Sequence, residues 1–75
     1  MQIYRNMGGD SGVTGFEISD GSIVVEFKDR SAYLYDYSRP GQAAVEYMKQ
    51  LAIAGRGLNS YISSHVKKNY ARKLR

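Results

Sequence analysis

The sequence predicts an α+β fold, in which a three-stranded antiparallel β-meander is followed by two helices packed on one face of the sheet. Apolar residues alternate with polar ones between residues 13 and 37, and an Asp-Gly pair separates the first two alternating runs. Helical spacing replaces this alternation after Pro40. The 75 residues suffice for one small domain with a thin core, so the helices must supply the second layer that three strands need.

The first two strands are expected over residues 13–18 and 23–28, joined as a hairpin. In the first strand Thr14 and Phe16 share one face, because successive side chains of a strand point to opposite sides. The Asp20-Gly21 pair predicts a two-residue type I′ turn, in which both central residues have positive φ.

The third strand carries a tyrosine at every second position, and we call Tyr33, Tyr35 and Tyr37 the tyrosine row. These three side chains share one face of the strand. Exposed beside basic groups, such a row could stack unpaired bases. A chain this short needs its aromatic residues inside, so Tyr33 and Tyr35 are expected in the core, and Tyr37 is left open between the two. A two-residue turn before the strand would pair Val25 with Leu34, whereas a three-residue loop over residues 28–30 would pair Val25 with Tyr33. The longer loop is preferred because it gathers the larger apolar set on one face. It requires a left-handed conformation that Arg30 adopts less readily than glycine does.

The first helix is expected over residues 40–54. Ser38 or Arg39 would be its N-cap, and Pro40 suits the first turn because the ring fixes φ and no amide donor is needed there. Gly55 is expected to end this helix, because glycine readily adopts the left-handed conformation found after the last helical residue.

A second helix is expected to begin near Leu58 or Asn59. It would bury Leu58, Ile62 and Val66, or Tyr61 and His65 if the helix is rotated slightly. The residues expected to be buried together in the core are Val25, Phe27, Tyr33, Tyr35, Met48, Leu51 and Ile62.

The chain divides into three segments by composition. Residues 1–12 hold three glycines among polar residues and are expected to form a flexible lead-in, of which Ile3 and Tyr4 could pack on the domain. Residues 13–66 are expected to form the single domain and residues 67–75 a basic C-terminal tail. Residues 1–54 carry five basic and seven acidic side chains, whereas residues 55–75 carry six basic side chains and no acid. A charge block confined to one end is typical of a segment that contacts a polyanion.

The basic segment supplies the candidate nucleic-acid-binding residues, which are Arg56, Lys67, Lys68, Tyr70, Arg72 and Lys73. Lysine and arginine would contact phosphates, and Tyr70 between them would stack on a base. The alternative is that this tail only increases solubility or places cations at the end of a helix.

The chain resembles the KTSC domain, a family named after the C-terminus of some lysyl-tRNA synthetases. The motifs that carry the resemblance are Gly15-Phe16, Gly21, residues 23–27, Tyr33-Leu34-Tyr35, Gly55-Arg56, Leu58-Asn59 and Ile62. The resemblance covers roughly residues 11–74, and the Tyr-any-Tyr pair in a central strand is the family's marker. It implies the same α+β fold, and the RNA binding suggested for the family would be the implied function.

Two apolar residues depart from the pattern of that family. Members usually carry polar residues where this chain has Val24 and Leu34. An apolar pair on a face expected to meet solvent indicates a surface for a protein partner or a second copy of the chain.

Several classes of function are not expected. The absence of cysteine excludes disulfides and thiolate metal sites and fits a reducing cytosol, and there is no long apolar run to span a membrane. His65 is the one histidine, and Ser63 and Ser64 beside it are not expected to face it on a helix. The acids are scattered, so no enzyme activity, metal or cofactor is expected.

The sequence thus favours a small non-enzymatic nucleic-acid-binding module in the cytoplasm, with RNA as the favoured partner. The alternative is a protein-interaction module, such as a phage or mobile-element accessory protein, that acts through Val24 and Leu34. The chain is expected to be a monomer or a weak homodimer.

Overall fold

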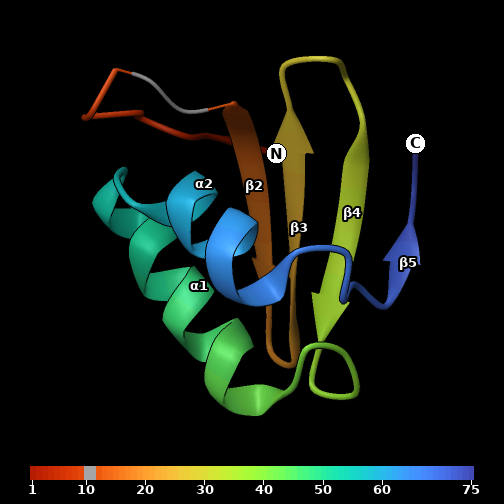
Figure 1. Ribbon diagram of the computed structural model, residues 1–75. Helices are drawn as coiled ribbons and strands as arrows, with labels where there is room; N and C mark the ends of the chain where they lie inside the picture. The colour runs from red at the N-terminus through yellow and green to blue at the C-terminus, as the bar shows by residue number, and fades with distance from the viewer. Residues whose placement is uncertain (10–11) are drawn as a thin grey trace.

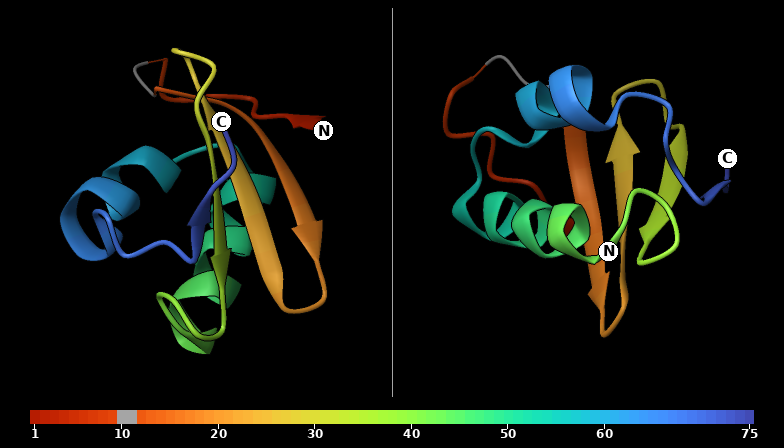
Figure 2. Two further views of the ribbon diagram at one scale, coloured as in Figure 1. Left: turned by 90° about the vertical axis from the view of Figure 1, so that its right-hand side faces the viewer. Right: turned by 60° about the horizontal axis from the view of Figure 1, so that its bottom comes forward.

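A five-stranded antiparallel sheet forms one layer of the protein, and helices cover one of its faces (Figures 1 and 2). The computed structural model describes residues 1–9 and 12–75. The strands lie in the order of the chain and are β1 (Gln2–Ile3), β2 (Val13–Ser19), β3 (Ser22–Phe27), β4 (Ala32–Asp36) and β5 (Arg72–Lys73). The helices are α1 (Gln42–Ala54), α2 (Leu58–Tyr61) and the π-helical η1 (Ile62–Val66).

The α+β class is therefore confirmed, but the sheet has five strands instead of the predicted three. Strand β1 comes from the segment predicted as a flexible lead-in, and β5 comes from the segment predicted as a basic tail. Both are two residues long, too short for an alternating pattern to appear in the sequence. Because β5 follows the helices, the predicted order of meander and then helices holds only up to η1. Asp10 and Ser11, also in the predicted lead-in, lie outside the described residues.

The hairpin of β3 and β4 has the predicted register. Val25 lies opposite Tyr33 in the ladder. The Phe27 amide donates to the Ser31 carbonyl over 2.9 Å, which closes a three-residue loop over residues 28–30. Arg30 has the left-handed φ of 70° that this loop requires. Tyr33 and Tyr35 therefore lie on the helix-covered face of the sheet, whereas Tyr37 lies in the turn after β4 and is exposed.

The first hairpin closes over Asp20-Gly21 as predicted, but the turn type was wrong. Ser19 pairs with Ser22, and neither Asp20 nor Gly21 has positive φ. The Asp20 carbonyl accepts hydrogen bonds from the Lys49 ammonium at 2.8 Å and from the Tyr37 hydroxyl at 3.3 Å. These long-range contacts fix the orientation of a peptide that local preference alone would turn differently.

Strand β2 contains a bulge that the sequence did not predict. Val13 lies opposite Phe27 and Gly15 lies opposite Glu26, so Thr14 is an extra residue in this strand. As a result Val13 and Phe16 are both buried, whereas Thr14 is exposed instead of sharing the face of Phe16.

Helix α1 begins two residues later than predicted, at Gln42 with Gly41 as its N-cap. Ser38 and Arg39 belong instead to a turn held by the Asp36 carboxylate. One oxygen of Asp36 accepts from the Ser38 amide at 2.9 Å, the Ser38 hydroxyl at 2.6 Å and the Arg39 amide at 3.0 Å. The other end of α1 is as predicted, because Gly55 has φ 77° and its amide donates to the Leu51 carbonyl at 2.9 Å.

The core lies between the sheet and the helices and includes more of the chain than predicted. Leu58, Ile62 and Val66 are buried, as the first of the two predicted helix faces requires. Tyr4, from the predicted lead-in, is also buried and its hydroxyl accepts from the Leu58 amide at 3.3 Å. Of the residues predicted to be buried together, Val25, Tyr35, Met48 and Ile62 are buried, whereas Phe27, Tyr33 and Leu51 are partly buried against them.

Candidate functional site

A cleft of about 580 Å³ opens on the helical side of the sheet, beside the β3–β4 loop and the end of η1. The chain leaves η1, crosses the helical face of the sheet and returns to pair with β4 as β5 (Figures 1 and 2). Two groups of side chains dominate the lining. We call Phe27, Tyr33, Tyr35 and Tyr70 the aromatic wall, and Lys28, Lys67, Lys68 and Lys73 the lysine rim.

The rings of the aromatic wall contact one another. The ring centres of Phe27 and Tyr33 lie 5.8 Å apart, edge to face, and those of Tyr33 and Tyr70 lie 4.6 Å apart with a tilt of 49°. Tyr70 also meets Tyr35 edge to face at 6.4 Å. Tyr35 is fully buried, and this burial raises the pKa of its hydroxyl, whereas the other three rings are only partly buried. The wall thus offers apolar ring surface from side chains whose positions are fixed by packing.

The lysine rim comes from three different parts of the chain. Lys28 starts the β3–β4 loop, Lys67 and Lys68 follow η1, and Lys73 lies in β5. All four are exposed. Lys73 lies opposite Tyr33 in the ladder, and its ammonium is 5.8 Å from the centre of the Tyr33 ring. Four positive charges therefore surround an apolar wall.

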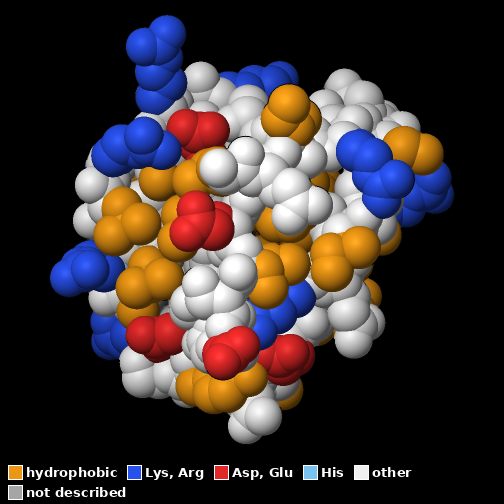
Figure 3. Space-filling view, turned by 180° about the vertical axis from the view of Figure 1, so that it is seen from behind, with side chains coloured by type: hydrophobic (Ala, Val, Ile, Leu, Met, Phe, Trp, Pro, Cys, Tyr) orange, Lys and Arg blue, Asp and Glu red, His pale blue; other side chains and the backbone are white. Residues whose placement is uncertain are grey.

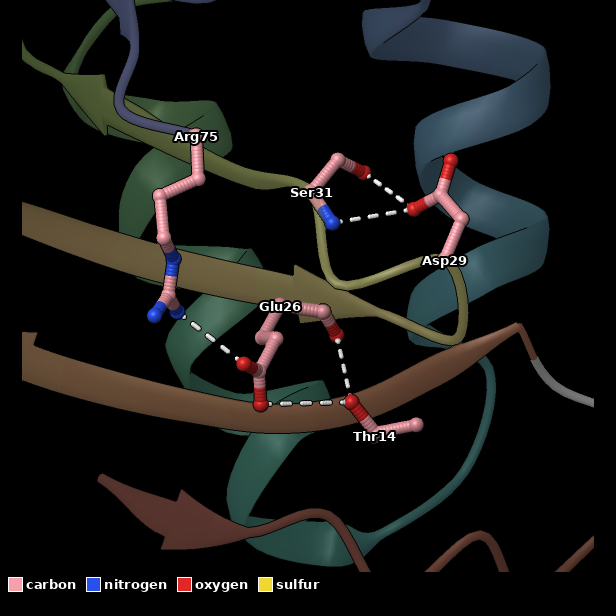
Figure 4. Close-up of polar contacts among 5 residues, drawn as sticks. All are labelled: Thr14, Glu26, Asp29, Ser31 and Arg75. Carbon is pink, nitrogen blue, oxygen red and sulfur yellow. Dashed lines mark hydrogen bonds and ion pairs between the residues drawn. The ribbon is translucent and has the colours of Figure 1, made fainter.

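One acidic residue, Asp29, is among the described residues that line the cleft. Its carboxylate accepts hydrogen bonds from within its own loop. One oxygen accepts from the Ser31 hydroxyl at 2.5 Å and from the Ser31 amide at 3.0 Å (Figure 4). These hydrogen bonds lower the pKa of Asp29 below its usual value. The cleft lining keeps an excess of positive charge despite this one acid.

The backbone at Lys67 is strained. Its φ of 54° and ψ of −125° are values that glycine adopts more readily than a residue with a side chain. Such conformations cost on the order of 1–3 kcal/mol and are concentrated at functional sites. The turn is closed by the Asn69 amide, which donates to the Val66 carbonyl at 3.0 Å. This turn directs the chain from η1 across the sheet and places Lys67 and Lys68 on the cleft.

The structure brings together four of the six predicted nucleic-acid-binding residues, namely Lys67, Lys68, Tyr70 and Lys73. Arg56 is separate and lies with Tyr4 and Asn59 beside a smaller hollow of about 120 Å³. Arg72 lies opposite Leu34 in the ladder, and alternation along β5 therefore assigns it to the outer face of the sheet. Neither arginine belongs to the cleft.

Sequence reasoning missed Lys28, assigned Phe27 to the core, and favoured a core position for Tyr33 over base stacking. The predicted three-residue loop could have pointed to Lys28. The loop starts at Lys28, directly after Phe27, and therefore places Lys28 at the same end of the sheet as Tyr33. Only the crossing segment after Lys67 shows that this end of the sheet stays partly open.

The outer face of the sheet holds the alternative interaction residues. Val24 lies opposite Leu34, and both are partly buried. Beside them the Glu26 carboxylate accepts from Arg75 at 3.0 Å and from the Thr14 hydroxyl at 3.4 Å (Figure 4). Figure 3 shows that acidic side chains interrupt the apolar ones on this face, with basic side chains at its margins.

Ser64 and His65 do contact each other, contrary to the expectation from helical geometry. The Ser64 hydroxyl lies 3.0 Å from His65 Nδ1, and it also lies 2.6 Å from the Ser60 carbonyl, to which it donates. Because the Ser64 hydroxyl directs its proton to the Ser60 carbonyl, that proton is not directed to the imidazole, as the proton of a nucleophile would be to its base. Tyr61 stacks on the imidazole with ring centres 5.0 Å apart.

Comparison with models of protein families, with curated proteins and with solved structures finds no match for this chain. The resemblance to the KTSC domain thus rests on the sequence motifs and stays a prediction. Within the described part of the chain, no helix combines the length and apolar character that crossing a bilayer requires.

Proposed function

We propose that the protein is a small non-enzymatic nucleic-acid-binding module that uses the cleft, with RNA as the favoured ligand. The observation that carries this proposal is the meeting of the lysine rim with the aromatic wall in one cleft. Lysines that neutralise phosphates release counterions and supply most of the affinity for a polyanion. Aromatic rings supply a second kind of contact, to the flat faces of bases.

The convergence of the lysines supports binding more strongly than the basic composition does. A tail that only increased solubility would need no particular arrangement. Here Lys28, from the part of the chain with a negative balance, joins three lysines from the basic segment around the same cleft. RNA is favoured over DNA because of the implied relationship to the KTSC domain.

Direct titration tests this proposal. Anisotropy of labelled 12-nucleotide RNA and DNA would be measured at near-physiological salt with the parent protein and with Lys67→Gln/Lys68→Gln. The double variant Arg39→Gln/Arg56→Gln removes the same charge outside the cleft and is the matched control. Selective weakening by the cleft substitutions supports the proposal, whereas equal weakening by both pairs, or no binding to either strand, contradicts it.

A second candidate function is protein interaction through the outer face, as a partner-binding module or a weak homodimer. It is favoured by Val24 and Leu34, an apolar cross-strand pair on the face that the helices leave uncovered. Sedimentation of the parent protein, with and without substitutions at this pair, tests it.

A further inference from the structure

We infer that the cleft binds an unpaired base, so that the module selects single-stranded over double-stranded nucleic acid, with Phe27 and Tyr33 as the stacking surface. This inference rests on the proposed function and specifies its ligand. The expectation from the sequence placed Tyr33 in the core and the stacking ring at Tyr70, with stacking by the tyrosine row as the alternative.

The size of the cleft suits a nucleotide. Its volume of about 580 Å³ lies within the range of roughly 300–1,000 Å³ that is usual for sites of small organic ligands. A duplex keeps its bases stacked on one another and presents only their edges and the phosphates to a protein. An unpaired base can place its flat face against the aromatic wall, which a base inside a duplex cannot do.

The aromatic wall offers a base two partly exposed rings, Phe27 and Tyr33. Their centres are 5.8 Å apart and their planes are inclined at 76°, so a base that lies flat on one ring meets the edge of the other. Tyr70 packs on Tyr33 at 4.6 Å and on Tyr35 at 6.4 Å, so it supports the Tyr33 ring. Rings already fixed in place lose little side-chain entropy when a base stacks on them.

The lysine rim places positive charge where the backbone of a nucleic-acid strand lying across the aromatic wall would need it. Lys28 lies on the β3–β4 loop, Lys67 and Lys68 lie at the end of η1, and Lys73 lies on β5, so positive charge borders the wall from three separate elements. A nucleotide seated on the wall carries a phosphate on each side of its sugar. Lysines from three elements are therefore available to contact these phosphates.

Paired ligands of equal charge provide the test. A 12-nucleotide single strand without self-complementarity would be compared with a hairpin of the same length whose loop is an abasic linker, so that every base in the hairpin is paired. Both would be tested as RNA and as DNA, and each single strand would carry one 2-aminopurine. We expect at least tenfold tighter binding of the single strand and quenching of 2-aminopurine fluorescence when the base stacks.

Two substitutions locate the stacking surface. Phe27→Leu and Tyr33→Leu keep apolar volume but remove the flat ring, and each should weaken single-strand binding roughly 5- to 150-fold with an unchanged salt dependence. Tyr47→Leu is the matched control, because Tyr47 is an exposed ring on α1 that does not line the cleft.

The outcomes separate the inference from the proposed function. Equal affinity for hairpin and single strand, without quenching, would overturn the inference while the proposed function stands. No binding to any of the four ligands would overturn both. If the leucine variants fail to fold, as shown by circular dichroism, the quenching and the hairpin comparison on the parent protein still decide.

Discussion

Tyr33 and Lys73 lie directly opposite each other in the ladder of β4 and β5, with the Lys73 ammonium 5.8 Å from the centre of the Tyr33 ring. The tyrosine row and the basic segment, which look like separate features in the sequence, thus meet at this pair, as they also do where Tyr70 packs on Tyr33. A cation over an aromatic face is stabilised by the ring's electrons. The same pair joins the two contact types that the proposed function needs, and the following predictions test their separate contributions.

The salt dependence of RNA binding should report the lysine rim. Four phosphate contacts, one for each lysine of the rim, predict a slope of about −3 in a log–log plot of affinity for a single strand against salt. Lys67→Gln/Lys68→Gln should make the slope shallower by roughly one to two units, without altering sequence preference, because phosphate contacts position and do not specify. A slope unchanged by this double variant would show that these lysines do not contact phosphate.

Glycine at position 67 should stabilise the fold while weakening binding. Lys67→Gly relieves a conformation that costs on the order of 1–3 kcal/mol, and the flexibility of glycine offsets about 0.5–1 kcal/mol of this. A net gain of about 1 kcal/mol in the free energy of unfolding is expected from urea denaturation. Lys67→Gln, which keeps the strain, is the control and should leave stability nearly unchanged; a loss of stability in the glycine variant would disprove the strain.

Phe16 should matter more to stability than Phe27, although only Phe27 was predicted to lie in the core. Phe16 is 2% exposed, so Phe16→Ala should lower the free energy of unfolding by about 3–5 kcal/mol through lost burial and a cavity. Phe27 is partly exposed in the cleft, and Phe27→Ala should cost less. Urea denaturation of both variants makes the comparison, and equal losses would argue against the exposed position of Phe27.

Acid should weaken the turn before α1. The hydrogen bonds from the Ser38 hydroxyl and from the Arg39 amide hold the pKa of Asp36 below its usual value. Because the folded state has the lower pKa, this stabilisation is present above the unfolded-state pKa of about 4 and is lost as the pH falls through the folded-state value. Asp36→Asn should therefore reduce the steepness of acid unfolding below about pH 4, measured by circular dichroism; an unchanged acid profile would contradict it.

The outer face provides a test of the second candidate function. Val24→Glu with Leu34→Arg should leave the fold and RNA binding intact, because both residues lie on the face of the sheet opposite the cleft. If this face is an interface, the double variant should abolish self-association or partner capture in sedimentation and pull-down. A monomer before and after substitution, with unchanged capture, would remove this candidate.

The parts of the fold that depend on local chemistry could be predicted from the sequence. The pairing of Val25 with Tyr33 follows from a three-residue loop, and the end of α1 follows from Gly55. Features set by distant contacts could not be predicted. The bulge at Thr14 shows itself only when Val13 and Phe16 must both reach the core.

The candidate site could likewise be predicted only in part. Lys67, Lys68, Tyr70 and Lys73 were predicted from their charge and spacing, and they do line one cleft. Arg56 and Arg72 have the same chemistry, but the side of the molecule on which they lie depends on the path of the chain after Gly55 and on the pairing of β5. No pattern in the sequence reports that path, and two-residue strands leave no periodic trace.

The weak attachment of β5 to the sheet also determines how easily the cleft opens. Lys73 lies forty positions after Tyr33 in the chain, yet the strand that carries it pairs with β4 at two positions. Adjoining backbone bonds, such as that from the Leu74 amide to the Ala32 carbonyl at 2.7 Å, add to this short ladder. Short terminal strands fray at a small fraction of the free energy of global unfolding. Amide hydrogen exchange at Lys73 and Leu74 should therefore be faster than in β3. A ligand that contacts both β4 and β5 should slow this exchange, because it would hold the least stable pair of strands together.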